Sequence, residues 1–230
     1  MTYFKFLLPL LLAGTSVFAQ YKIELKNISP NYQAKISMED CSGDECRGEA
    51  TIELINNATK KVQNFTSGNF TFYIKDQPAP VKGQLSTVTF DALMESPVII
   101  DDFNFDGTED VAIRNGSLGN YGAPSYDVYV YNMTQKKFVP SKELTELASN
   151  YLGFFEVDPE RKRLIVYGKS GAAFHYTAEY AVVPGKGLLR VFEVEEDASG
   201  GEKVKVTKKE LINHKWIKTV KNYPIEEYYK

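Results

Sequence analysis

The sequence predicts a mainly β protein, an antiparallel β-sandwich or propeller-like single domain with one short helix. Two observations predict this class. Short segments that alternate apolar and polar residues recur along the chain, and Gly, Pro, Asn or Asp residues separate them. The 230 residues also include 15 Tyr and 14 Phe, aromatic types that favour strands over helices.

Residues 1–19 have the pattern of a secretory signal peptide. Lys5 precedes an apolar run at residues 6–12, and residues 17–19 form an acceptable cleavage site. The run is too short to span a membrane comfortably and no other stretch approaches that length, so we expect no stable membrane insertion. The sequence therefore predicts an exported protein whose mature part is residues 20–230.

The predicted strands are short and follow one another along the mature chain. They lie at residues 21–25, 50–55, 70–74, 97–100, 111–113, 126–131, 164–167, 174–183, 188–194 and 203–206. Residues 76–83 contain two prolines and form a loop that could separate a small N-terminal sheet, residues 20–90, from the rest. One helix is predicted at residues 141–149, capped by Ser141. No internal repeat is visible, which argues against a propeller of equal blades.

Cys41 and Cys46 are the only cysteines of the chain. In an oxidising compartment we expect them to form a local disulfide that staples a turn. The alternative is a redox or metal-binding pair. A zinc site would need two further ligands, and His175 and His214 are the only histidines.

The most distinctive stretch is an acidic loop at residues 101–110. Oxygen-bearing side chains stand at Asp102, Asn104, Asp106, Thr108 and Asp110. Gly107 stands where a chain that wraps around a cation must turn sharply, so the pattern predicts a bound calcium ion, Ca²⁺. An EF-hand would place Glu at the position of Ile113, and both flanks are predicted strands rather than helices. We therefore expect a structural ion; the alternative is a solvated acidic turn.

A glycine-rich segment follows the acidic loop. Residues 114–124 contain three glycines and a proline, and glycine permits backbone angles that other residues avoid. We expect a tight loop lying against the ion site. In the strand that follows, Tyr126, Val128 and Val130 should share one face, and Asp127, Tyr129 and Tyr131 the other.

The sequence excludes several function classes. A net charge of −3 gives no global basic field, so we expect no nucleic-acid partner. The segment Gly168-Lys169-Ser170 is not a phosphate-binding loop, because the first glycine of that motif would fall at Arg163 and no helix follows. It also misses the nucleophile elbow by one glycine. No convincing catalytic set is left, and we expect no enzyme activity.

Together with the signal peptide, three stretches carry a resemblance to a known group. The stretches are residues 102–110, residues 119–129 and residues 170–176. They resemble the periplasmic immunity proteins that neutralise lysozyme-like effectors of bacterial type IV secretion, which are similar in fold to periplasmic inhibitors of invertebrate-type lysozyme. The resemblance covers residues 97–180. It implies a periplasmic protein whose partner is a lysozyme-like peptidoglycan hydrolase.

The resemblance further implies that a loop enters the active cleft of the hydrolase. In the lysozyme inhibitors a Ser-Gly turn followed closely by Tyr does this. The candidates here are Lys169, Ser170, Gly171, His175 and Tyr176. Two alternatives are that this is an ordinary hairpin turn with His175 packed in a strand, or that the glycine-rich loop near Tyr121 is inserted. A different function class, a calcium-dependent surface adhesion or carbohydrate-binding module, is the runner-up.

Overall fold

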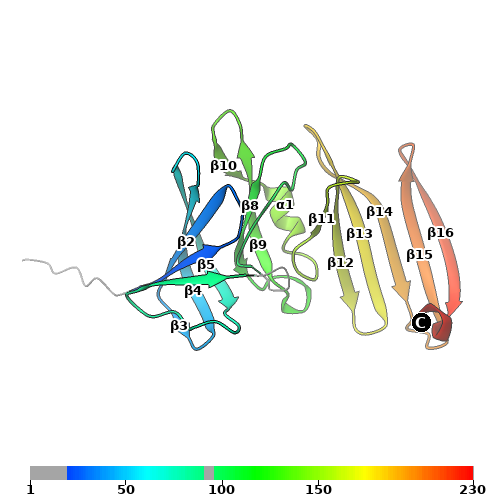
Figure 1. The fold of residues 1–230 in the computed structure, drawn as a ribbon. Coiled ribbons are helices and arrows are strands. Elements are labelled where there is room, and N and C mark those ends of the chain that lie inside the picture. Colours follow the sequence, from blue (N-terminus) through cyan, green and yellow to red (C-terminus); the bar gives the residue numbers. More distant parts are fainter. Residues whose placement is uncertain (1–19, 91–95, 230) are drawn as a thin grey trace, which may run out of the picture.

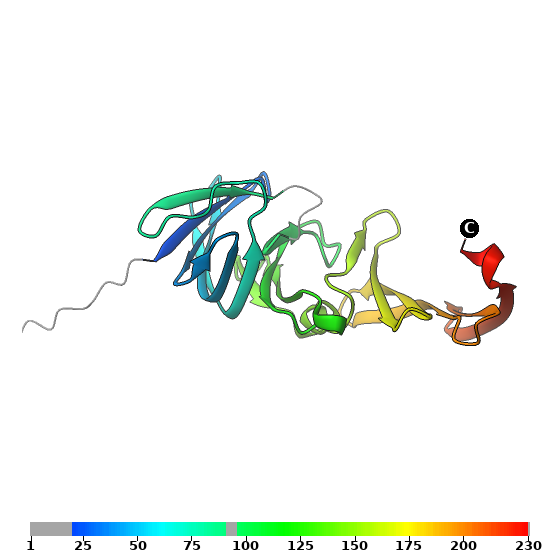
Figure 2. The same cartoon turned by 90° about the horizontal axis from the view of Figure 1, so that it is seen from below.

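The computed structural model describes residues 20–90 and 96–229, and the predicted signal peptide lies outside them. Three β-sheets follow one another along the long axis of the molecule, with sheet 1 at one end and sheet 3 at the other (Figures 1 and 2). Among the described residues, no helix has the length and apolar character needed to cross a membrane.

Sheet 1 contains six strands and holds the N-terminal part of the chain. They are β1 (Tyr21–Lys26), β2 (Tyr32–Met38), β3 (Cys41–Ser42), β4 (Glu45–Asn56), β5 (Val62–Tyr73) and β6 (Leu85–Thr89). Neighbouring strands are antiparallel except β1 and β6, which pair in parallel. Alternate residues of β2 and β4 are buried, because one face of the sheet covers a core and the other meets solvent.

Sheet 2 is antiparallel and lies in the middle of the row. Its order is β10 (Lys137–Pro140), β9 (Ser125–Asn132), β8 (Asp110–Gly116) and β7 (Val98–Asp101). Both faces of this sheet are covered. Val111 and Ile113 of β8 pack into the first core, against sheet 1, whereas Ala112 packs into the second core, against α1 (Lys142–Leu147) and sheet 3.

Sheet 3 is a meander of six antiparallel strands in sequence order. They are β11 (Glu156–Asp158), β12 (Arg163–Ser170), β13 (Phe174–Val183), β14 (Gly187–Asp197), β15 (Lys203–Ile212) and β16 (Lys215–Pro224). The second core takes its sheet 3 residues from the first strands of the meander, including Leu164, Val166 and Ala178. The last strand, β16, is exposed along most of its length, and lysines along an edge strand discourage pairing with another chain.

The mainly β class is confirmed, and several local predictions hold with it. The predicted helix is present as α1, which ends at Leu147, two residues earlier than expected, and Ser141 is its N-cap residue without a capping side-chain hydrogen bond. Tyr126 and Val128 enter the second core while Tyr129 and Tyr131 pack on the first, as their alternation predicts.

Two parts of the fold differ from the simplest sequence expectation. The sheets of the described residues follow one another in a row rather than around a ring (Figure 2), so no propeller is seen there. The sequence predicts one helix, at residues 141–149, whereas the structure has a second short helix, α2 (Ile225–Tyr228), after β16. Pro224 ends the strand since it cannot donate a hydrogen bond to the ladder.

The predicted disulfide between Cys41 and Cys46 is present and joins β3 to β4. Replacing the pair by Cys41→Ser and Cys46→Ala should lower the free energy of unfolding by about 2 kcal/mol, because a disulfide that closes so short a loop restricts the unfolded chain only modestly. Urea denaturation of oxidised wild type and the double variant measures this. If reduction of the wild type lowers the free energy of unfolding by the same amount, the cross-link is the cause. Identical unfolding midpoints for the oxidised wild type and the double variant would contradict the prediction.

Candidate functional site

The acidic loop joins β7 to β8, and its last member is buried. Asp110 is 0% exposed and begins β8. Its carboxylate accepts hydrogen bonds from the backbone N–H groups of Phe103 (3.1 Å), Asn104 (3.3 Å) and Tyr131 (2.9 Å). This carboxylate therefore ties the start of the loop to β9 of the same sheet.

The other predicted ligands lie on the exposed side of the loop and bind its own backbone. Asp102 accepts from the N–H groups of Asp106 (3.1 Å) and Gly107 (2.9 Å). Asp106 accepts from the backbone N–H (2.8 Å) and the hydroxyl (2.6 Å) of Thr108, and Asn104 accepts from the N–H of Asp106 (2.9 Å). Gly107, with φ at 87°, makes the turn that the sequence assigned to it.

The donor chemistry of the loop fits a hard cation, since every predicted ligand offers oxygen. Burial is the main cause that raises the pKa of Asp110 to about 7, and the negative charges of Asp106 and Asp102 contribute in the same direction. The hydrogen bonds from the backbone N–H groups of Tyr131 and Phe103 lower this pKa and partly offset the rise. Within the described residues, however, no three His, Cys, Asp or Glu side chains are gathered closely enough to hold a metal. The calcium ion therefore stays a prediction.

The glycine-rich segment and the β12–β13 turn meet and form one protrusion. The segment continues from the end of β8 that is remote from the acidic loop, so the expectation that it lies against the ion site is wrong. It contains a short 3₁₀ helix, η1 (Asn120–Gly122). The hydroxyl of Tyr121 accepts a hydrogen bond from the backbone N–H of Gly171 (2.5 Å), and the side-chain amide of Asn120 donates to the carbonyl of Lys169 (2.9 Å). The ammonium of Lys169 lies 5.0 Å from the centre of the Tyr121 ring. We call η1 together with residues 169–172 the double-loop protrusion.

The backbone of the protrusion explains its glycines. A Cβ at Gly119 would lie 2.7 Å from the carbonyl of Tyr151 and 2.8 Å from that of Ala123, so only glycine fits there. Tyr121 has a φ of 58° and is 63% exposed, an unusual conformation that the contacts with Lys169 and Gly171 hold in place. The two loops that the sequence offered as alternative inserted elements are thus parts of one surface feature.

The predicted inhibitory residues do not all share one face. Lys169 pairs with His175 across the strands, whereas Gly168 pairs with Tyr176. Because directly paired residues share a face and successive residues alternate, Lys169 and His175 lie on the opposite face from Tyr176. Ser170 and Gly171 are exposed at the tip.

Tyr176 lies in a tyrosine pair at the edge of the second core. Its ring is parallel to that of Tyr151, with centroids 6.3 Å apart, and the hydroxyl of Tyr151 shares a hydrogen bond of 2.9 Å with Tyr180. Burial raises the pKa of Tyr176. These contacts make Tyr176 a residue that supports the protrusion from the strand below.

A buried acid that sequence reasoning missed lies beside this tyrosine pair. Glu193 of β14 is 4% exposed, and it forms ion pairs with Arg190 (2.9 Å) and with Lys209. Burial opposes its charge, but the hydrogen bond from Lys209 and the charge of Arg190 together lower its pKa. Alternating acids in β14 and lysines in β15 are visible in the sequence, yet only the strand register shows which of them meet.

Comparisons with known proteins identify a similar fold but no family. No protein family model matches the chain, and no curated protein matches its sequence. Among solved structures, the "Structure of a Xanthomonas Type IV Secretion System related protein" is similar, with a TM-score of 0.62 and 20% sequence identity, over 83% of this chain and 90% of that chain. At this identity the likeness shows a shared fold.

Asp110→Asn should destabilise the protein by about 1–3 kcal/mol even when a chelator is present. The amide cannot accept from all three N–H groups, so at least one buried donor loses its partner. Thermal and urea melts in EGTA measure this. Asp101→Asn is the matched control. Asp101 is exposed and, within the described part of the chain, accepts only the N–H of Asp102, which an amide oxygen also satisfies. Equal stability of both variants would contradict the role of Asp110.

Proposed function

We propose that this protein is a periplasmic immunity protein that inhibits a lysozyme-like peptidoglycan hydrolase by inserting the double-loop protrusion into its active cleft. The observation that carries the proposal is the junction of the β12–β13 turn with Tyr121. Two loops from different sheets brace each other there and present an exposed tip. Of the three stretches that carry the resemblance to such inhibitors, residues 119–129 and 170–176 contribute to this protrusion and to the strands β9 and β13, whereas residues 102–110 form the acidic loop at the other end of β8.

The chemistry of the protrusion suits a cleft that holds carboxylates. Hydrolases of this class cleave glycosidic bonds with a pair of Asp or Glu residues. Lys169 offers an ammonium group, Ser170 offers a hydroxyl, and His175 lies on the same face as Lys169. Because Tyr121 and Asn120 already hold the turn, insertion would cost little conformational entropy. The protein itself would then need no catalytic group.

Other observations support export and a setting in bacterial secretion. The Cys41–Cys46 disulfide is consistent with an oxidising compartment such as the periplasm. The solved structure with a similar fold is described as related to a type IV secretion system. The expected partner is therefore a hydrolase delivered by, or acting beside, such a system.

Calcium binding at the acidic loop is a further part of the proposal. An ion held by Asp102, Asn104, Asp106, Thr108 and Asp110 would offset the repulsion between carboxylates and fix the start of β8. Calcium should then raise the melting temperature, and EGTA should lower it, because binding to the folded state alone stabilises it. Magnesium at equal concentration controls for ionic strength. A melting temperature indifferent to both additions would remove calcium from the proposal.

Lys169→Ala and His175→Ala should each weaken inhibition about tenfold or more, the effect expected for a central contact of an interface. Inhibition of a purified lysozyme-like effector on cell-wall substrate measures this, with melting temperature as the check on folding. Lys186→Ala is the matched control, since Lys186 is exposed at the opposite end of β13, in the turn to β14.

Tyr176→Ala is a less direct test, because the loss of its packing against Tyr151 should also lower stability. Inhibition that stays at the wild-type level in both Lys169→Ala and His175→Ala, with the fold intact, would contradict insertion of this turn. Binding to glycan without a stoichiometric complex with any hydrolase would favour an adhesion or carbohydrate-binding module instead.

A further inference from the structure

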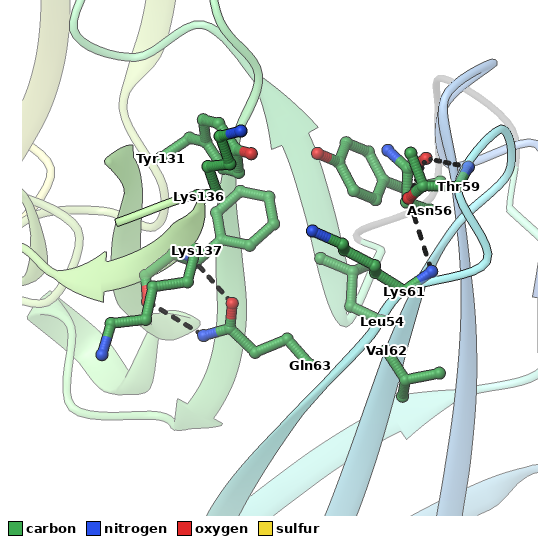
Figure 3. Close-up of a pocket in the computed structure, with 11 residues that line it drawn as sticks. Leu54, Asn56, Thr59, Lys61, Val62, Gln63, Tyr131, Lys136 and Lys137 are labelled. Atoms are coloured by element: carbon green, nitrogen blue, oxygen red, sulfur yellow. Dashed lines mark hydrogen bonds between the residues drawn. The ribbon is translucent and has the colours of Figure 1, made fainter. Parts of the chain in front are cut away.

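A recess between sheet 1 and sheet 2 lies at the ends of two hairpins. One wall comes from the β4–β5 turn and the other from the β9–β10 turn, and the space between them has a volume of about 610 Å³ (Figure 3). Aromatic, aliphatic, amide and lysine side chains line it. The size is within the range of pockets that hold small ligands.

The floor of the recess is apolar and its sides carry hydroxyl groups. Phe138 is 5% exposed, and the rings of Tyr32 and Tyr131 pack edge-on against it, with centroids 5.5 and 5.3 Å away. Leu54, 2% exposed, completes the floor. Both tyrosines are partly exposed, so their rings and hydroxyls can meet a ligand that has apolar and polar parts.

Hydrogen bonds fix the walls before any ligand arrives. The side-chain amide of Gln63 donates to the carbonyl of Phe138 and accepts from its N–H, each at 2.9 Å, and so clamps β5 to β10. Asn56 closes the β4–β5 turn by accepting from the backbone N–H groups of Ala58 (3.2 Å) and Thr59 (2.8 Å). The recess is therefore a preformed site, which reduces the entropy cost of binding.

The charge around the recess has one sign. Lys61, Lys136 and Lys137 line it, and no Asp or Glu does among the residues that the structure describes. None of the three lysines forms an ion pair with another residue in the described part of the chain. Figure 3 shows the ammonium group of Lys61 directed into the space between the two turns, with the Tyr131 hydroxyl across from it. Glu109, whose charge contributes to the raised pKa of Tyr32, accepts hydrogen bonds at both carboxylate oxygens, from Ser29 and from Asn31.

We propose that this recess is a binding site for an anionic saccharide of one or two units, a sugar that carries a carboxylate or phosphate group. The tyrosine rings and Phe138 would contact the ring of the sugar. The tyrosine hydroxyls and the side-chain amides of the recess would form hydrogen bonds with the hydroxyl groups of the sugar. Lys61 and Lys136 would bind its anionic group. The site uses neither the acidic loop nor the double-loop protrusion, so it does not depend on the proposed inhibition. The β9–β10 turn also lies at the opposite end of the molecule's short axis from the β12–β13 turn (Figure 1).

The site is tested by titrating the full mature protein with ligands. The readout is the NMR chemical shifts of the recess residues. N-acetylmuramic acid and N-acetylglucosamine differ by one carboxylate-bearing ether group, and N-acetylglucosamine 6-phosphate separates phosphate from carboxylate as the anion. We expect saturable shifts with one or both acidic sugars, with a dissociation constant on the order of 1 mM, and at least about fivefold weaker binding of the neutral sugar.

Matched variants locate the binding. Lys61→Gln and Lys136→Gln should each weaken binding of the acidic sugar about fivefold. Lys60 lies in the β4–β5 turn beside Lys61 but does not line the recess, so Lys60→Gln should bind the sugar as the wild type does. Hydrolase inhibition should stay unchanged in all three, so failure here is distinguishable from failure of the proposed function. The proposal would be overturned if neutral and acidic sugars bound equally well, or if lactate or inorganic phosphate alone bound as well as the acidic sugars. It would also be overturned if an acidic tripeptide bound more tightly, or if no saturable shifts were seen.

Discussion

Burial of sheet 2 on both faces is the constraint on which the rest of the structure depends. Residues 110–114 of β8 are all buried, so any polar group in this strand must find a partner inside the protein. Asp110 meets this demand with three backbone N–H groups at the start of β8, and Arg114 donates to the carbonyl of Gly116 (2.8 Å) at its end. The acidic loop enters this strand and the glycine-rich segment leaves it. Both special loops are therefore anchored to a strand whose side chains are almost all buried.

Local patterns carried most of what could be predicted from the sequence. Alternation identified the strands and assigned Tyr126 and Tyr129 to opposite faces, because the side-chain period of a strand is 2 and each face of sheet 2 meets a core. The spacing of Cys41 and Cys46 within one turn identified the disulfide. These features depend on residues near each other in the chain, where steric and hydrophobic patterns act directly.

Contacts between distant segments could not be predicted in the same way. Tyr121 and Gly171 meet only because sheets 2 and 3 pack through the second core, and no local pattern encodes that packing. The same is true of the recess, whose walls are brought together by the Gln63 clamp across two sheets. The separation of His175 from Tyr176 is different. Strand alternation alone places neighbours on opposite faces, so that division of the predicted set was available from the sequence.

The two proposed sites also show why the charge of the whole chain is a poor guide to its ligands. A net charge of −3 excludes a global basic field, yet Lys61, Lys136 and Lys137 surround a recess that no carboxylate of the described residues 20–90 and 96–229 lines. Two buried acids elsewhere have internal partners: Asp110 accepts from three backbone N–H groups, and Glu193 forms ion pairs with Arg190 and Lys209. Charges that are satisfied internally contribute little to an approaching ligand, whereas unpaired surface lysines contribute at short range, within a Debye length of about 8 Å. Local pairing, which only the fold determines, therefore decides where this acidic chain can attract an anion.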